Sequence, residues 1–127
     1  GYGIAHPEVA DLMNRVRQPF NCNNLAIAAA AAALGDEEFV ARSYALNRAG
    51  MEQIVAGLKR LGYAHIPSSG NFLAFKAGDA AALNQKLLKQ GVIVRPVAGY
   101  GMPEWLRVTI GSENENARFL EALELAQ

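Results

Sequence analysis

Two short apolar stretches, GVIVR at residues 91–95 and WLRVTI at residues 105–110, each carry a single arginine among branched and aromatic side chains. This composition is typical of β-strands. The segment between them, residues 96–104, contains the prolines and glycines of a loop. We therefore predict two neighbouring strands, at residues 92–95 and 105–110, joined by that loop.

The sequence on either side of these strands predicts a compact unit. Two further strands are predicted at residues 63–66 and 71–76, because the intervening Pro67-Ser68-Ser69-Gly70 has the composition of a turn. A helix is predicted over residues 79–90, and Ser112 followed by Glu115 is a capping-box pattern that opens a last helix ending at Ala126. The predicted fold class is α+β: helices followed by a small, mostly antiparallel sheet with helices on one face.

The first half of the chain is predicted to be helical. Residues 1–5 have the composition of the end of a strand, and helices are expected at residues 7–17, 24–34 and 37–61. At 1.5 Å per residue the third helix would span about 40 Å, which is more than a small domain needs. We therefore expect it to link two bodies, and we expect the first two helices to expose apolar surface that favours self-association.

Composition excludes several classes of function. The 127 residues carry 12 Lys+Arg and 12 Asp+Glu, and this balance argues against a nucleic-acid-binding surface. No apolar run approaches the roughly 18 residues of a membrane span, and no secretory signal is visible. The single cysteine, Cys22, cannot form an internal disulfide or a multi-cysteine metal site. We expect a cytoplasmic domain without a metal, nucleic acid or membrane partner.

Arg95 and Arg107 are the candidate binding residues, because each lies where apolar residues dominate. A guanidinium group on a strand extends from a rigid backbone. Its planar set of N–H donors matches the oxygen atoms of a carboxylate or a phosphate. Alternatively, both arginines lie on a solvated face, or one of them pairs with Glu104 or Glu113. Spacing alone leaves both interpretations open.

The other polar candidates are isolated in the sequence. Each is more typical of a loop or a core position than of a catalytic group. They are Tyr2, His6, Asn21, Cys22, Asn23, Asn24, His65 and Tyr100.

Five segments, taken in order, carry a resemblance to a known family. They are GYGIA at residues 1–5, RQPFN at 17–21, SGNF at 69–72, GVIVR at 91–95 and LRVTIG at 106–111, the last continuing into Glu113 and Asn116. Together they resemble the C-terminal third of the fold-type-I, pyridoxal-phosphate-dependent aminotransferases, and most of all the histidinol-phosphate aminotransferases. Any one segment is weak evidence, whereas the ordered series covers nearly the whole chain.

The resemblance implies a division of the chain. Residues 1–35 would be a remnant of the large cofactor-binding domain, residues 36–62 the long linking helix, and residues 63–127 the C-terminal small domain. It also implies that the Schiff-base lysine precedes Gly1. No catalytic residue is therefore assigned within the chain, and we expect the chain alone to be inactive. The lysines present do not match the family's motif; they are Lys59, Lys76, Lys86 and Lys89.

The resemblance also implies an activity for the intact parent enzyme. In that enzyme Arg107 would bind the anionic group of the substrate, and Arg95 would be a second arginine that binds the substrate phosphate. The parent would use pyridoxal phosphate to move an amino group between histidinol phosphate and 2-oxoglutarate, a 2-oxo acid, in histidine biosynthesis, as a homodimer. No residue of this chain is assigned to the cofactor. The alternatives are an aromatic aminotransferase, a threonine-phosphate decarboxylase, and a non-catalytic anion-binding α+β module.

Overall fold

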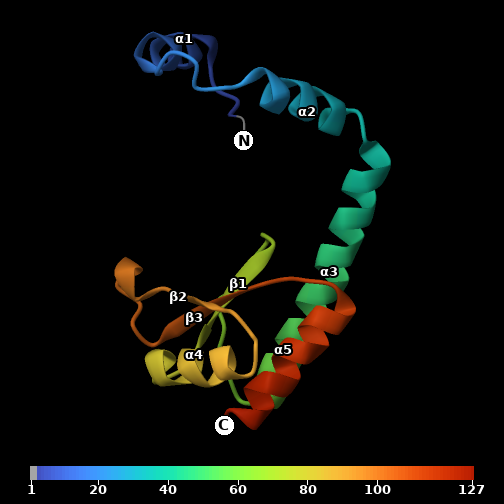
Figure 1. The fold of residues 1–127 in the computed structure, drawn as a ribbon, viewed down its shortest axis with the longest axis vertical. Helices are drawn as coiled ribbons and strands as arrows, with labels where there is room; N and C mark the ends of the chain where they lie inside the picture. Colours follow the sequence, from blue (N-terminus) through green and yellow to red (C-terminus); the bar gives the residue numbers. More distant parts are fainter. Residues whose placement is uncertain (1–2) are drawn as a thin grey trace. The chain divides into compact units, whose positions relative to one another are not determined.

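The computed structural model describes residues 3–127. The chain divides into two compact units, one up to Glu38 and one from Phe39 to Gln127 (Figure 1). Within the described residues, no helix has both the length and the apolar character needed to cross a membrane. We describe the two units separately.

The first unit consists of helices α1 (Pro7–Val16) and α2 (Asn24–Leu34). Pro7 stands at the start of α1, where its missing N–H costs no hydrogen bond. The Asn23 side chain caps α2 by accepting a hydrogen bond from the Ala26 N–H at 2.8 Å. Residues 3–5 form no strand, contrary to expectation. Gly1 and Tyr2 lie outside the described residues.

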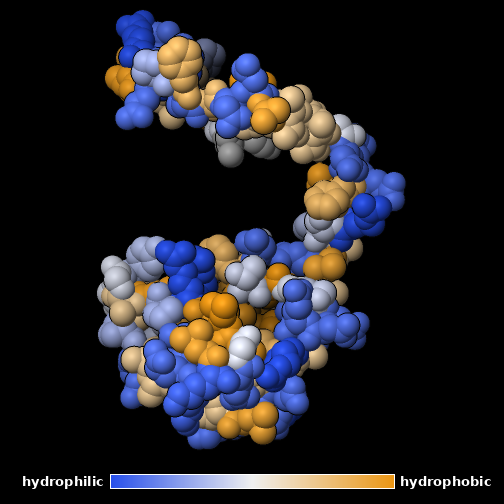
Figure 2. All heavy atoms as spheres, viewed as in Figure 1, coloured by the Kyte–Doolittle hydropathy of each residue, from blue (hydrophilic) through white to orange (hydrophobic). Residues whose placement is uncertain are grey.

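The apolar side chains of the first unit lie at its surface, as the sequence predicts (Figure 2). Neither helix contains a buried residue. The apolar positions of α1 follow a helical spacing and form one exposed stripe: Val9, Leu12, Met13 and Val16.

The second unit combines helices with a three-stranded sheet. Its elements are helix α3 (Glu37–Arg60), which begins just before the unit boundary, then β1 (Phe72–Lys76), α4 (Ala80–Lys89), β2 (Arg95–Pro96), the 3-10 turn η1 (Ala98–Tyr100), β3 (Trp105–Thr109) and α5 (Glu113–Leu125). The strand order is β1-β3-β2, and both pairings are antiparallel. The predicted α+β class is confirmed, and so is the capping box of Ser112 and Glu115.

Two predicted strands differ from the structure. Residues 63–66 pair with β1 through a single bridge, His65 with Phe75: the Ile66 N–H donates to the Ala74 carbonyl at 2.9 Å, and the Lys76 N–H donates to the Ala64 carbonyl at 2.8 Å. The pairing goes no further, and the chain bends at residues 69–71 before it enters β1. The strand predicted at residues 92–95 pairs only from Arg95 to Pro96. The Val92 N–H instead donates to the Leu87 carbonyl at 3.0 Å, so this part of the chain completes the end of α4 and stays out of the sheet.

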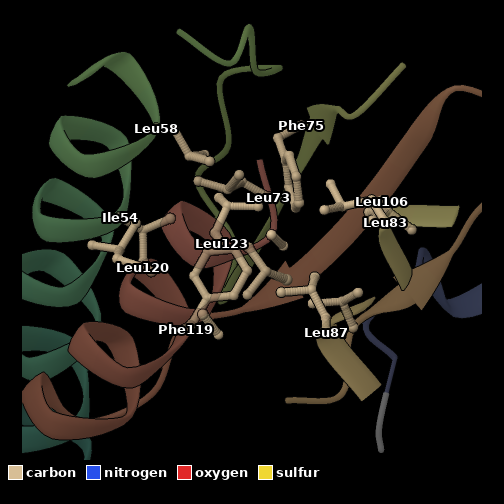
Figure 3. Packing of buried hydrophobic residues seen from close by; sticks show 14 of the residues in the cluster. Ile54, Leu58, Leu73, Phe75, Leu83, Leu87, Leu106, Phe119, Leu120 and Leu123 are labelled. Carbon is tan, nitrogen blue, oxygen red and sulfur yellow. The ribbon is translucent and has the colours of Figure 1, made fainter. Parts of the chain in front are cut away.

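The core lies between one face of the sheet and helices α3, α4 and α5 (Figure 3). Alternation along β1 and β3 turns one set of side chains into this core. Phe75 meets Phe119 edge to face, with ring centroids 5.8 Å apart. The largest fully buried side chains are Ile54, Leu58, Leu73, Phe75, Leu87, Leu106, Leu123 and Asn116. The opposite face of the sheet, which includes Arg107, is half-buried to exposed.

Two glycines let α3 pack closely on its neighbours. A Cβ atom at Gly57 would overlap the Leu120 side chain of α5. A Cβ atom at Gly50 would lie 2.6 Å from Ile110 Cγ2 and 2.7 Å from Asn116 Nδ2. Both positions therefore require the absence of a side chain.

Candidate functional site

The sheet register brings the two candidate arginines together. Arg95 of β2 lies directly opposite Arg107 of β3, and Arg107 lies opposite Ala74 of β1. Directly opposed residues of an antiparallel pair project from the same face, with Cα atoms about 4.5–5.5 Å apart. Two guanidinium groups therefore originate side by side on the open face of the sheet.

Neither arginine has a carboxylate partner within residues 3–127. Glu104, one of the two partners considered from the sequence, pairs with Lys76 instead, with Nζ and Oε2 3.3 Å apart. Other arginines of the same unit do have carboxylates within 4 Å: Arg48, Arg60 and Arg118. Like charges directly opposite each other across strands repel, and a bound anion relieves that repulsion. The two arginines are therefore better placed to bind an anion than to form ion pairs with carboxylates of the chain.

A surface hollow of about 850 Å³ adjoins this pair. It lies where residues 91–94 separate from β3, and its size suits a small organic molecule. Its lining comes from residues 91–95, 107–111, 114–116, 118 and 119. Both arginines belong to it, so an anion held by them has room for the rest of a ligand.

The buried amide of Asn116 fixes the chain where β3 ends. Its Oδ1 accepts a hydrogen bond from the Gly111 N–H at 2.9 Å, and its Nδ2 donates to the Gly111 carbonyl at 3.1 Å. Asn116 is not among the candidate binding residues that the sequence predicts. One feature of the sequence does indicate that Asn116 is buried. It lies three, four and seven residues before Phe119, Leu120 and Leu123, which places it on the apolar side of α5.

The capping box begins beside that amide. The Ser112 N–H donates to Glu115 Oε2 at 2.8 Å, and the Ser112 hydroxyl lies 2.7 Å from the same oxygen. Hydrogen bonds from the Ser112 side chain and then from its backbone lower the pKa of Glu115. Asn116 and Glu115 thus tie α5 to the strand that carries Arg107.

Arg107 also contacts an aromatic ring on the open face. Its Cζ lies 4.6 Å from the centroid of the Phe72 ring. A second, mostly apolar hollow of about 320 Å³ begins here, and Arg107 lines it together with Phe72 and Tyr100. Arg107 therefore lines two hollows, a larger one that also contains charged side chains and a smaller, mostly apolar one.

The remaining candidates have structural surroundings. His65 lies in the isolated bridge, and His6 precedes α1 without a side-chain capping bond. Asn21 accepts a hydrogen bond from Arg17 at 2.8 Å, and Cys22 is exposed. No cluster of metal-binding side chains occurs in the part of the chain that the structure describes.

The sheet thus presents Arg95 and Arg107 as neighbours on one face, with no carboxylate partner for either within the described residues. Residues 1–123 match the family model of the class I and II aminotransferases, and the chain belongs to that family.

Named relatives extend the comparison. The chain is 77% identical over 126 residues to histidinol-phosphate aminotransferase 1 of Dechloromonas aromatica, covering 99% of this chain and 35% of the relative. It is 63% identical over 127 residues to histidinol-phosphate aminotransferase 2 of Nitrosospira multiformis, covering 99% and 32%. The chain thus spans about a third of the length of these curated relatives.

A solved structure shares the fold. The histidinol-phosphate aminotransferase of Sinorhizobium meliloti, in complex with pyridoxal-5'-phosphate, superposes with a TM-score of 0.80 at 24% identity. The match covers 94% of this chain and 34% of that one.

The described lysines do not fit an imine-forming role beside the arginine pair. Lys76 pairs with Glu104, and Lys86 Nζ donates to the Ala126 carbonyl at 2.7 Å. Lys59 and Lys89 lie in the last turns of α3 and α4. None of the four lines the 850 Å³ hollow. The described lysines are therefore not part of the hollow that contains Arg95 and Arg107.

Proposed function

We propose that this chain is the C-terminal part of an aminotransferase that moves an amino group between histidinol phosphate and 2-oxoglutarate. The observation that carries the proposal is the pairing of Arg95 with Arg107 on an open sheet face, with no carboxylate partner for either within residues 3–127. The names of the two close relatives support the same substrate.

The two arginines would hold the phosphate of the substrate. A phosphate dianion offers oxygens to both guanidinium forks, and hydrogen bonds between charged groups are about twice as strong as neutral ones. Because both arginines start from paired strands, the bound phosphate would fix the position of the amino group before any proton moves.

Other parts of the complete enzyme would supply the remaining chemistry. Pyridoxal phosphate acts as the electron sink for amino transfer when it is bound. Under this proposal residues 1–35 belong to the large cofactor-binding domain, residues 36–62 link the domains, and residues 63–127 form the small domain. The enzyme would be a cytoplasmic homodimer in histidine biosynthesis.

The test compares two substrates in the complete enzyme. Replacing Arg107→Ala should raise the KM for histidinol phosphate roughly 10- to 100-fold, the loss expected for hydrogen bonds to a charged group. The KM for unphosphorylated histidinol should change much less, because that substrate has no phosphate to lose. Arg48→Ala is the matched control, since Arg48 pairs with Glu52 on α3 and lies outside the 850 Å³ hollow. Equal losses on both substrates would contradict a phosphate-binding role.

A further inference from the structure

The register of β1 and β3 places an aromatic ring diagonally beside Arg107. Phe72 lies opposite Thr109, and Ala74 lies opposite Arg107, all on the open face of the sheet. Diagonal neighbours of this kind are within reach of aromatic and long side chains. The small Ala74 side chain leaves space for the guanidinium group over the Phe72 ring, with Cζ 4.6 Å from the ring centroid.

Stacking suits an arginine that must bind an anion. A guanidinium group is attracted to the face of an aromatic ring, and its N–H donors lie in its own plane. A contact with Phe72 through the flat face of the guanidinium would leave the donors at its edge available. A carboxylate partner would occupy those donors, and within residues 3–127 Arg107 has none.

The same contact opposes a repulsion built into the sheet. Arg95 lies directly opposite Arg107, and two positive charges at that separation push each other apart when no anion is bound. The attraction to the Phe72 ring favours one orientation of the Arg107 guanidinium before the ligand arrives. Such preorganisation improves affinity, because less side-chain freedom is lost on binding.

The surroundings of the ring strengthen this effect. Phe72 and Arg107 line the 320 Å³ hollow with Val97, Tyr100 and Met102, so apolar atoms border one side of the guanidinium. Electrostatic interactions are stronger where fewer water molecules screen them. Phe72 thus gives Arg107 an aromatic contact beside a mostly apolar hollow.

We propose that Phe72 is a positioning residue that holds Arg107 for binding the substrate phosphate. This inference rests on the proposed function. It concerns a side chain that makes no contact with the phosphate and acts through Arg107 alone.

The experiment measures steady-state kinetics of the complete enzyme with Phe72→Leu and Phe72→Tyr. Phe72→Leu removes the ring and keeps an apolar side chain, so the KM for histidinol phosphate should rise roughly three- to tenfold while kcat stays within about twofold. Phe72→Tyr keeps the ring face and should remain within about twofold of the parent in both constants. Inorganic phosphate, used as a competitive inhibitor, should weaken in parallel with the KM of the Leu variant.

A double-mutant cycle separates the two proposals. In an Arg107→Ala background, Phe72→Leu should cause no further rise in KM, because the residue on which it acts is gone. If Phe72→Leu leaves KM and phosphate inhibition unchanged while Arg107→Ala impairs both, the positioning role is refuted and the proposed function stands. Equal losses in the Leu and Tyr variants would also refute it. If Arg107→Ala itself leaves the phosphorylated substrate unaffected, the proposed function fails and the inference fails with it.

Discussion

Replacing Gly50→Ala should destabilise the second unit by forcing α3 away from the end of β3. The added Cβ would lie 2.6 Å from Ile110 Cγ2, 2.7 Å from Asn116 Nδ2 and 3.1 Å from the Gly111 carbonyl oxygen. Carbon atoms in good contact lie about 3.5–4.0 Å apart, so the first overlap alone is about 1 Å. Asn116 cannot move aside freely, because it is buried and holds Gly111 through two hydrogen bonds.

Three terms set the size of the effect. Overpacking costs about 1–3 kcal/mol, and weakening the Asn116 hydrogen bonds in a buried site costs about 1–3 kcal/mol more. Alanine in place of glycine within a helix returns about 1 kcal/mol. The expected loss in the free energy of unfolding is therefore about 1–5 kcal/mol.

The assay is urea unfolding of the chain followed by circular dichroism, with amide hydrogen exchange at Gly111 as a local measure. Ala56→Gly is the matched control, because Ala56 is exposed on the same helix and reports the helix-propensity term without a clash. The Gly50→Ala variant should also show faster exchange at Gly111. A Gly50→Ala protein that is as stable as the parent, or more stable, would refute the close approach of α3 to the end of β3.

Two further predictions concern helix ends in the same unit. Asp79→Ala removes the side chain that accepts the Ala82 N–H at 2.9 Å, so it should lower the free energy of unfolding by about 1 kcal/mol in urea, whereas Asp79→Asn should lose little. The hydrogen bonds from Ser112 lower the pKa of Glu115, so the ionised carboxylate stabilises the folded state above its unfolded pKa, and this contribution is lost as pH falls through the lowered folded pKa. Unfolding free energies measured across acidic pH should therefore fall less steeply in Ser112→Ala than in the parent; identical slopes would remove Glu115 from the acid response.

Local sequence determined the helices and their ends, because those signals act within a few residues. Pro7 begins α1, the spacing of apolar residues predicts α3, and the Ser112-to-Glu115 pattern forms its capping box in the structure. The ordered series of segments resembles the aminotransferases, and the family comparison confirms that resemblance.

The strand ends depended on tertiary structure, because pairing is settled between distant parts of the chain. Residues 92–94 have the composition of a strand, yet Val92 completes the end of α4 and pairing starts only at Arg95. His65 makes a single bridge with Phe75, although residues 63–66 have the composition of a strand.

The candidate site shows the same division between sequence and tertiary structure. The sequence singled out Arg95 and Arg107, because charged residues are unusual within apolar strands. Only the tertiary structure places the two arginines opposite each other and Arg107 in contact with the Phe72 ring. It also pairs Glu104 with Lys76 and not with an arginine. The need for glycine at position 50 and the buried bonds of Asn116 likewise depend on how closely α3, β3 and α5 pack, which no pattern within a single segment contains.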